Sequence, residues 1–185
     1  MALVSSTMVP LGSPASQFTL PDGLGRWFSI TDVMGKDGLL VVFICNHCPF
    51  VRHLAGFLQP LHDQLTTMGI GMVAINANDV IYYPDDAPEK MVAFAQQQGF
   101  NFPYLFDETQ AVARQYDAVC TPDFFLYDQA LRLFYRGQLD DSRPGNHRPI
   151  DGKDLLAAAA ALRQRTPYSA SQIPSVGCNI KWKLT

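Results

Sequence analysis

Two cysteines stand two residues apart in the segment CNHCP, in which Cys45 and Cys48 precede Pro49. The gap is short enough for their sulfur atoms to close a small disulfide. An unbroken apolar run over residues 39–44 precedes the pair and indicates a buried strand. Proline is favoured in the first turn of a helix, so the pattern predicts a strand, then Cys-x-x-Cys, then a helix. A helix N-terminus stabilises a thiolate, and we therefore expect Cys45 to attack and Cys48 to resolve the mixed disulfide.

His47 lies inside the gap between the two cysteines. An imidazolium there would favour the Cys45 thiolate, although a solvated polar residue at a helix start is the alternative. A thiolate that forms easily stabilises the reduced pair and makes the disulfide a stronger oxidant. We therefore predict a more oxidising couple than one with small neutral residues in the gap. Asn46 would only cap the helix.

Three other interpretations of the pair compete with redox chemistry. A zinc site usually needs a second close pair of ligands, but Cys120 and Cys178 stand alone, and His53 and His62 belong to the same predicted helix. Haem attachment needs histidine directly after the second cysteine, where Pro49 stands. Two buried, inert cysteines are the third interpretation, and the position at a helix start argues against it. We expect neither a metal nor an organic cofactor.

The composition limits the class of protein. The chain has 185 residues, a net charge of −3 and 48% hydrophobic residues, which suits one domain. No basic stretch indicates nucleic-acid binding, and no apolar run is long enough to span a membrane. The N-terminus lacks the pattern of a signal peptide, and four cysteines do not suggest a secreted disulfide framework. We therefore expect a cytoplasmic protein, since disulfides in a reducing compartment tend to be transient and catalytic.

Strands alternate with helices along the chain, which predicts an α/β sandwich with a mixed sheet. We expect a flexible segment over residues 1–15, one domain over 16–165 and a tail over 166–185. Pro60 should kink or split the helix after the cysteines. Asp86 and Glu89 have the spacing of a capping box for the next helix. The expected strands cover residues 18–20, 27–30, 39–44, 72–75, 103–106, 123–127 and 131–136, and the expected helices begin near residues 49, 86, 109 and 151.

The strand–CNHCP–helix unit and the segment VCTPDFFLYD (residues 119–128) resemble the thioredoxin superfamily. In that fold a cis proline precedes a strand and faces the redox cysteines, and Thr121–Pro122 occupies this place. The resemblance implies that the backbone at Thr121 pairs with an extended substrate, and it adds Thr121 and Pro122 to the candidate catalytic residues. The alternative for Pro122 is an ordinary proline at a strand start.

The opening segment SQFTLPDGLGRWFSITD resembles the N-terminal β-hairpin of the redoxin branch, the alkyl hydroperoxide reductase and thiol-specific antioxidant proteins. SRPGN and VGCNIKW are similar to segments of an uncharacterised CNHCP-containing bacterial subgroup. The resemblance implies a thioredoxin-like sandwich with an N-terminal hairpin. Peroxiredoxins carry proline and threonine or serine where Gly38 and Val42 stand, and thioredoxins carry tryptophan at Ile44. We therefore favour a thiol–disulfide oxidoreductase over a peroxiredoxin-like peroxidase of unusual form.

Cys120 and Cys178 are candidate auxiliary redox residues, although a small buried side chain and a bystander thiol are the alternatives. The expected partners are protein or small-molecule disulfides and a dithiol electron donor, and the oligomeric state is left open. A third hypothesis is a Cu(I) chaperone in which His147 joins the cysteines, since soft thiolates bind Cu(I). We expect Arg136 and Asp140 to be solvated surface residues.

Overall fold

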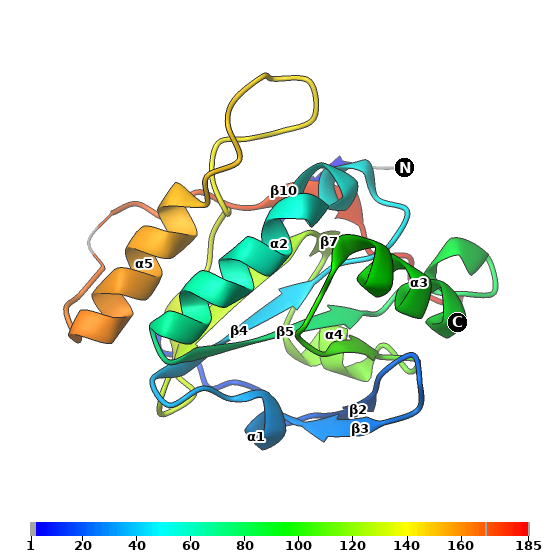
Figure 1. Ribbon diagram of the computed structural model, residues 1–185, viewed down its shortest axis with the longest axis horizontal. Coiled ribbons are helices and arrows are strands. Elements are labelled where there is room, and N and C mark those ends of the chain that lie inside the picture. Colours follow the sequence, from blue (N-terminus) through cyan, green and yellow to red (C-terminus); the bar gives the residue numbers. More distant parts are fainter. Residues whose placement is uncertain (1–2, 169, 185) are drawn as a thin grey trace.

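A five-stranded mixed sheet forms the centre of the computed structural model, which describes residues 3–168 and 170–184 (Figure 1). The strand order is β6-β5-β4-β8-β9. The first three strands run parallel, and β8 is antiparallel to both β4 and β9. The strands are β4 (Gly38–Phe43), β5 (Ile70–Asn76), β6 (Tyr104–Phe106), β8 (Asp123–Asp128) and β9 (Leu133–Tyr135).

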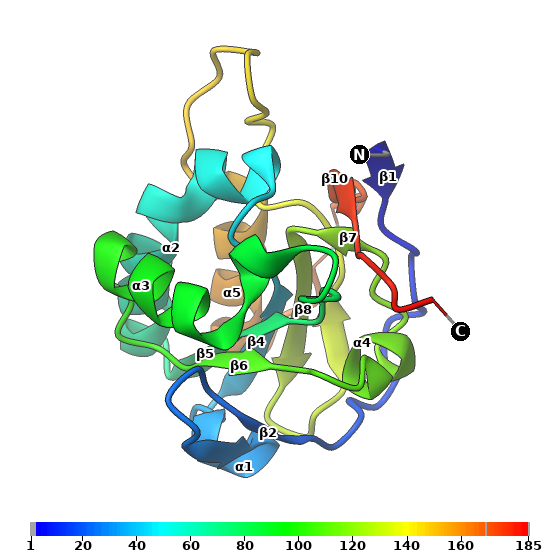
Figure 2. The ribbon, with the colours of Figure 1, turned by 90° about the vertical axis from the view of Figure 1, so that its right-hand side faces the viewer.

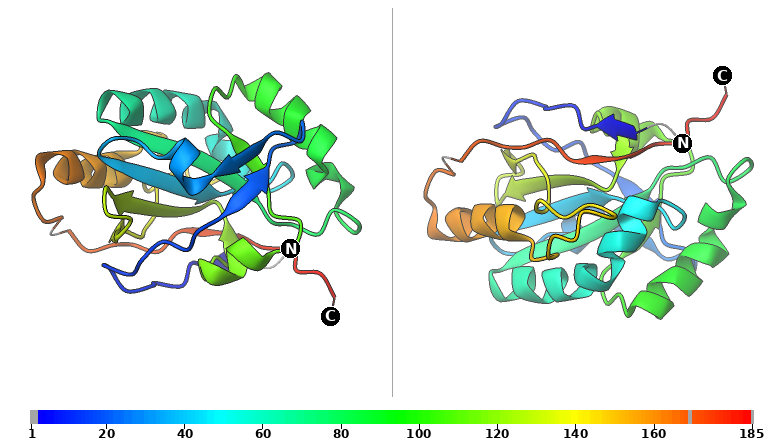
Figure 3. Two further views of the ribbon diagram at one scale, coloured as in Figure 1. Left: turned by 90° about the horizontal axis from the view of Figure 1, so that it is seen from below. Right: turned by 90° about the horizontal axis from the view of Figure 1, so that it is seen from above.

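Helices cover both faces of this sheet, as the views from below and above show (Figure 3). Successive side chains of a strand point to opposite faces, so Leu40 and Val42 pack against α2 and α5, while Leu39 and Val41 pack on the other side. Burial on both faces explains why β4 reads as a continuous apolar run. The helices are α1 (Ile30–Val33), α2 (Pro49–Thr67), the 3₁₀ turn η1 (Pro84–Asp86), α3 (Pro88–Gln98), α4 (Ala111–Gln115) and α5 (Lys153–Gln164).

A separate hairpin of β2 (Thr19–Pro21) and β3 (Trp27–Ser29) precedes the sheet. A single bridge between Asp22 and Leu105 attaches it to β6 at the edge of the sheet. The predicted α/β sandwich with an N-terminal hairpin is therefore confirmed. No helix among the described residues has the length and apolar character needed to cross a membrane.

A second sheet joins the two ends of the chain to the segment before Pro122. β10 (Val176–Asn179) lies between β1 (Leu3–Ser5) and β7 (Cys120–Thr121), and it is antiparallel to both (Figure 2). The expected loose N-terminal segment thus contains a paired strand, and so does the tail, in which we predicted no element. Strands of two to four residues are too short to show a periodicity, and their pairing partners lie far away in the sequence.

Several local expectations differ from the structure. α2 continues through Pro60 as one helix, so Pro60 does not split it. Arg136 and Asp140 are buried rather than solvated. Arg136 forms an ion pair with the buried Asp123 and lies 3.7 Å from the ring centroid of Phe125. Asp140 accepts three backbone N–H bonds and so fixes the loop that leads to α5. A buried charge persists only when it is paired or hydrogen-bonded, and most of the partners here lie 11 to 13 residues away in the sequence.

Candidate active site

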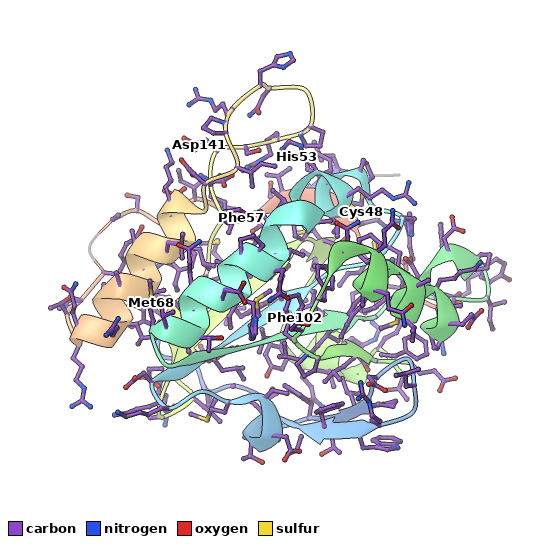
Figure 4. All side chains as sticks on the ribbon, viewed as in Figure 1. Cys48, His53, Phe57, Met68, Phe102 and Asp141 are labelled. Atoms are coloured by element: carbon purple, nitrogen blue, oxygen red, sulfur yellow. The ribbon has the colours of Figure 1, made fainter. Side chains whose placement is uncertain are left out.

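The two cysteines lie at the exit of the central strand β4 and at the start of α2. Cys48 is the N-cap residue of α2, and Pro49 is its first residue (Figure 4). Cys45 lies three residues earlier, just after Ile44, whose N–H extends the pairing of β4 with β5. Both side chains are buried, with 1% and 0% of their surface exposed, and their sulfurs hydrogen-bond to each other. The structure therefore brings together the pair that the sequence predicted.

Thr121 and Pro122 face this pair. Their peptide bond is cis, as the resemblance implied. The Thr121 hydroxyl lies 3.5 Å from the Cys45 sulfur, and the Cys48 sulfur lies 3.2 Å from the Thr121 carbonyl oxygen, to which it donates only when it is protonated. One residue thus touches both sulfurs, which places the strand before Pro122 directly against the reacting atoms.

The pKa shifts of the two thiols favour Cys48 as the ionised sulfur, whereas the sequence pattern favoured Cys45. Burial raises the pKa of Cys45 well above its ordinary value, and the hydrogen bond to Cys48 raises it further. The hydrogen bond from Cys45 lowers the pKa of Cys48 to about 5, with further contributions from Cys178 and the Val51 N–H in the first turn of α2. Burial opposes this effect without cancelling it, and the Thr121 side chain lowers the pKa of Cys48 further. Cys48 is also the residue at the helix N-terminus, where backbone N–H groups favour a thiolate.

A buried carboxylate, Asp86, positions the residues inside the gap. It accepts the Asn46 N–H at 2.7 Å and the Asn78 side-chain amide at 2.8 Å, and it bonds His47 Nδ1 at 2.6 Å. The His47 ring also stacks on Tyr83 at 5.5 Å between centroids. Asn46 is thus a member of this network rather than a helix cap, and Asp86 is not the N-cap of α3, which is Ala87.

The sequence also contained a signal that Asp86 lies near the cysteines. We instead interpreted its spacing to Glu89 as a capping box, which is a local explanation. Asp86 also follows β5, and the carboxyl ends of neighbouring parallel strands meet at one edge of a sheet. That rule places the segment after β5 at the same edge of the sheet as the cysteines that follow β4.

The two auxiliary cysteines differ in their surroundings. Cys178 hydrogen-bonds the Cys48 side chain, so it lies against the cysteine pair. Cys120 contacts the Pro122 carbonyl at 3.7 Å and the Asp123 side chain, and burial raises its pKa. Cys120 therefore lies near the site without a hydrogen bond to either active sulfur.

The strand edge expected to receive a substrate is paired within the chain. Cys178 lies opposite Thr121 and Asn179 opposite Cys120 in the β10–β7 pairing. Gly177 makes this close approach possible, because a Cβ there would lie 1.9 Å from the Thr121 carbonyl oxygen. The tail thus occupies the place that the resemblance assigned to an extended substrate.

A metal ion has one candidate ligand set among the described residues. Ligand atoms of Cys45, His47 and Asp86 lie within 4.8 Å of one another. Thiolate and imidazole suit Cu(I) or Zn(II), although Asp86 is already engaged by the three contacts given above. His147, the partner expected for a Cu(I) site, lies in the exposed loop that stands away from the body in Figure 1. The imidazole beside the cysteines is that of His47.

Comparison with known proteins agrees with this geometry. The model of the AhpC/TSA family matches residues 11–136, which include the hairpin, the cysteine pair and the cis proline. The chain belongs to the AhpC/TSA family.

Relatives of this AhpC/TSA protein carry both of the activities that its sequence suggested. Peroxiredoxin Bcp of Escherichia coli is 27% identical over 75% of the chain and 90% of its own length. The thiol-disulfide oxidoreductase ResA of Geobacillus thermodenitrificans is 29% identical over 66% of each chain. The crystal structure of an uncharacterised conserved protein from Geobacillus kaustophilus is 47% identical with a TM-score of 0.97, covering 100% of this chain and 98% of that one.

Proposed function

We propose that this protein is a thiol–disulfide oxidoreductase whose Cys45 and Cys48 alternate between a dithiol and a disulfide. The observation that carries the proposal is the hydrogen-bonded pair of sulfurs at the start of α2, with the cis proline segment against both. The ionised sulfur begins the exchange, and the lowered pKa of Cys48 supports Cys48 in this role. It attacks a substrate disulfide, and Cys45 then displaces the reduced substrate and leaves the Cys45–Cys48 disulfide.

The partners follow from this cycle. A disulfide substrate supplies the oxidising equivalents, and a second dithiol restores the reduced pair. The compartment that we propose is the cytoplasm, and the support is the cysteine usage of the chain, which does not suggest a secreted disulfide framework.

Turnover of insulin disulfides with dithiothreitol as reductant tests the proposal. Cys45→Ser and Cys48→Ser should each abolish turnover, because a net dithiol exchange needs both sulfurs. The matched control is Cys120→Ser, which leaves the pair intact and should retain turnover. Normal turnover by either single variant of the pair would overturn the proposal.

Peroxide reduction is the second candidate, because the Bcp relative is named a peroxiredoxin. The side chain of the buried Val42 has no hydroxyl group. The guanidinium of Arg136 forms an ion pair with Asp123 and is therefore not available to a cysteine thiolate. These features oppose a peroxide site of the form expected for peroxiredoxins. Stopped-flow mixing of the reduced protein with hydrogen peroxide separates the two activities, because a peroxidase thiol reacts much faster than free cysteine at the same pH.

A further inference from the structure

A third cysteine lies within reach of the active pair. β10 carries Cys178 into register with Thr121, and the Cys178 and Cys48 side chains hydrogen-bond. Cys48 therefore contacts two sulfurs, that of Cys45 and that of Cys178. All three belong to one buried apolar cluster under α2, from which water is largely excluded.

The placement of Cys178 matches that of a substrate cysteine. An extended segment that pairs with Thr121 places its own side chains against the active sulfurs, and β10 is such a segment. The tail is held there on both sides of Cys178. Gly177 allows the backbone to reach Thr121 and Pro122, while the N–H of Ile180 bonds the Val119 carbonyl at 2.9 Å.

We propose that Cys178 is a third redox cysteine that exchanges the Cys45–Cys48 disulfide for a Cys48–Cys178 disulfide within the chain. This inference rests on the proposed function, since it needs the first disulfide to form. The Cys178 thiolate attacks the Cys48 sulfur. The bond from Cys48 to Cys45 breaks as the bond to Cys178 forms, and Cys45 leaves with the electron pair and takes up the proton that Cys178 lost. One disulfide and one thiol are present before and after, so no external oxidant or reductant is consumed.

The state of Cys48 controls how readily Cys178 reacts. Burial raises the pKa of Cys178 to about 12, and the hydrogen bond and negative charge of Cys48 contribute to this rise. Once Cys48 belongs to a disulfide it carries no charge, so these two contributions disappear. Oxidation of the pair thus lowers the pKa of Cys178, which makes its sulfur a better nucleophile toward Cys48.

The test uses variants that all carry Cys120→Ser and reacts them with the small disulfide cystamine. In the Cys45→Ser protein, Cys48 first takes one cysteamine adduct. Cys178 should then displace it, so that intact mass spectrometry shows loss of the adduct and peptide mapping shows a Cys48–Cys178 disulfide. In the Cys45→Ser/Cys178→Ser protein, the adduct should persist. An adduct that persists equally in both proteins would overturn the inference.

Two further variants keep the test specific. Gly177→Ala in the Cys45→Ser background should slow loss of the adduct, because the new methyl group pushes β10 away from Thr121. Gly56→Ala is the matched control, since a Cβ there meets nothing within 4 Å. Equal rates in these two variants would also contradict the proposed contact. The Cys178→Ser protein should still form the Cys45–Cys48 disulfide, and its failure to do so would indicate that the proposed function itself is wrong.

Discussion

The charge of the reduced cysteine pair is predicted to reside on Cys48. A pKa of about 5 leaves that thiol about 99% ionised at pH 7, whereas a thiol with its ordinary value near 9 is about 1% ionised. Ultraviolet absorbance of the thiolate, followed against pH, should therefore show a titration near pH 5 in the reduced wild-type protein.

Two substitutions identify the sulfur that titrates. Cys48→Ala should remove the titration near pH 5, because burial keeps the remaining Cys45 thiol protonated through neutral pH. Cys45→Ala should keep the titration but move it to higher pH, since the largest contribution to the low pKa of Cys48 is the hydrogen bond from Cys45. Cys120→Ala is the control and should leave the curve unchanged. A titration near pH 5 that survives in Cys48→Ala would refute the assignment and return the thiolate to Cys45.

The same shift predicts the redox potential. Ionisation at a pKa of about 5 stabilises the reduced pair at pH 7 by about 2.7 kcal/mol relative to an un-ionised pair. For a two-electron couple this corresponds to about 60 mV in the oxidising direction. Equilibration with glutathione buffers should show this difference between wild type and a variant in which Cys48 titrates near its ordinary value. Equal potentials in the two proteins would contradict the predicted link between the pKa of Cys48 and the redox potential.

The shift also predicts how stability depends on pH. The folded-state pKa of Cys48 lies below its unfolded value, so its stabilisation of the reduced protein is complete above about pH 9. It falls as the pH decreases and is lost near pH 5. The oxidised protein has no such thiolate and should lack this dependence, which urea denaturation of both forms can measure.

Three further predictions concern the residues around the pair. Asp86→Ala should lower turnover by removing the carboxylate that holds His47, whereas Asp86→Asn should preserve part of it, as steady-state insulin reduction can show. Asp123→Ala should destabilise the fold by about 3–5 kcal/mol in urea denaturation, because it leaves the buried Arg136 charge without its partner; a cost below 1 kcal/mol would contradict this. If the reduced protein binds Cu(I), His47→Ala should weaken binding while His147→Ala should not, and the reverse order would favour the exposed loop as the source of the ligand.

The main sheet and the cysteine pair could be predicted from sequence because short local patterns of residues indicate both. The apolar run before Cys45 marks a strand buried on both faces, and Pro49 marks the start of α2. The cis bond before Pro122 came from the resemblance, not from local chemistry. These features depend on neighbours in the chain or on a motif that spans a few residues.

The location of the charge could not be predicted in the same way. The sequence places both cysteines near a helix start, and a difference of three residues decides which one caps it. The hydrogen bonds from Cys45 and Cys178 to Cys48 then add to that difference. Cys178 lies 130 residues from Cys48 in the sequence, and its short strand shows no periodicity that would reveal the pairing. Long-range pairing therefore contributes to the pKa of Cys48 in a way that no local pattern contains.

Burial of the sulfurs connects the tail to substrate access. Cys45 and Cys48 expose 1% and 0% of their surface, so an external disulfide reaches them only after a covering segment moves. β10 is bound to β7 through only two residue pairs, and short pairings of this kind open at low free-energy cost. The backbone of Thr121 that β10 releases is then available to the incoming peptide, which replaces the lost hydrogen bonds. A substrate would thus compete with the tail for the same strand edge, and the affinity for substrate should rise when Gly177→Ala weakens the internal pairing.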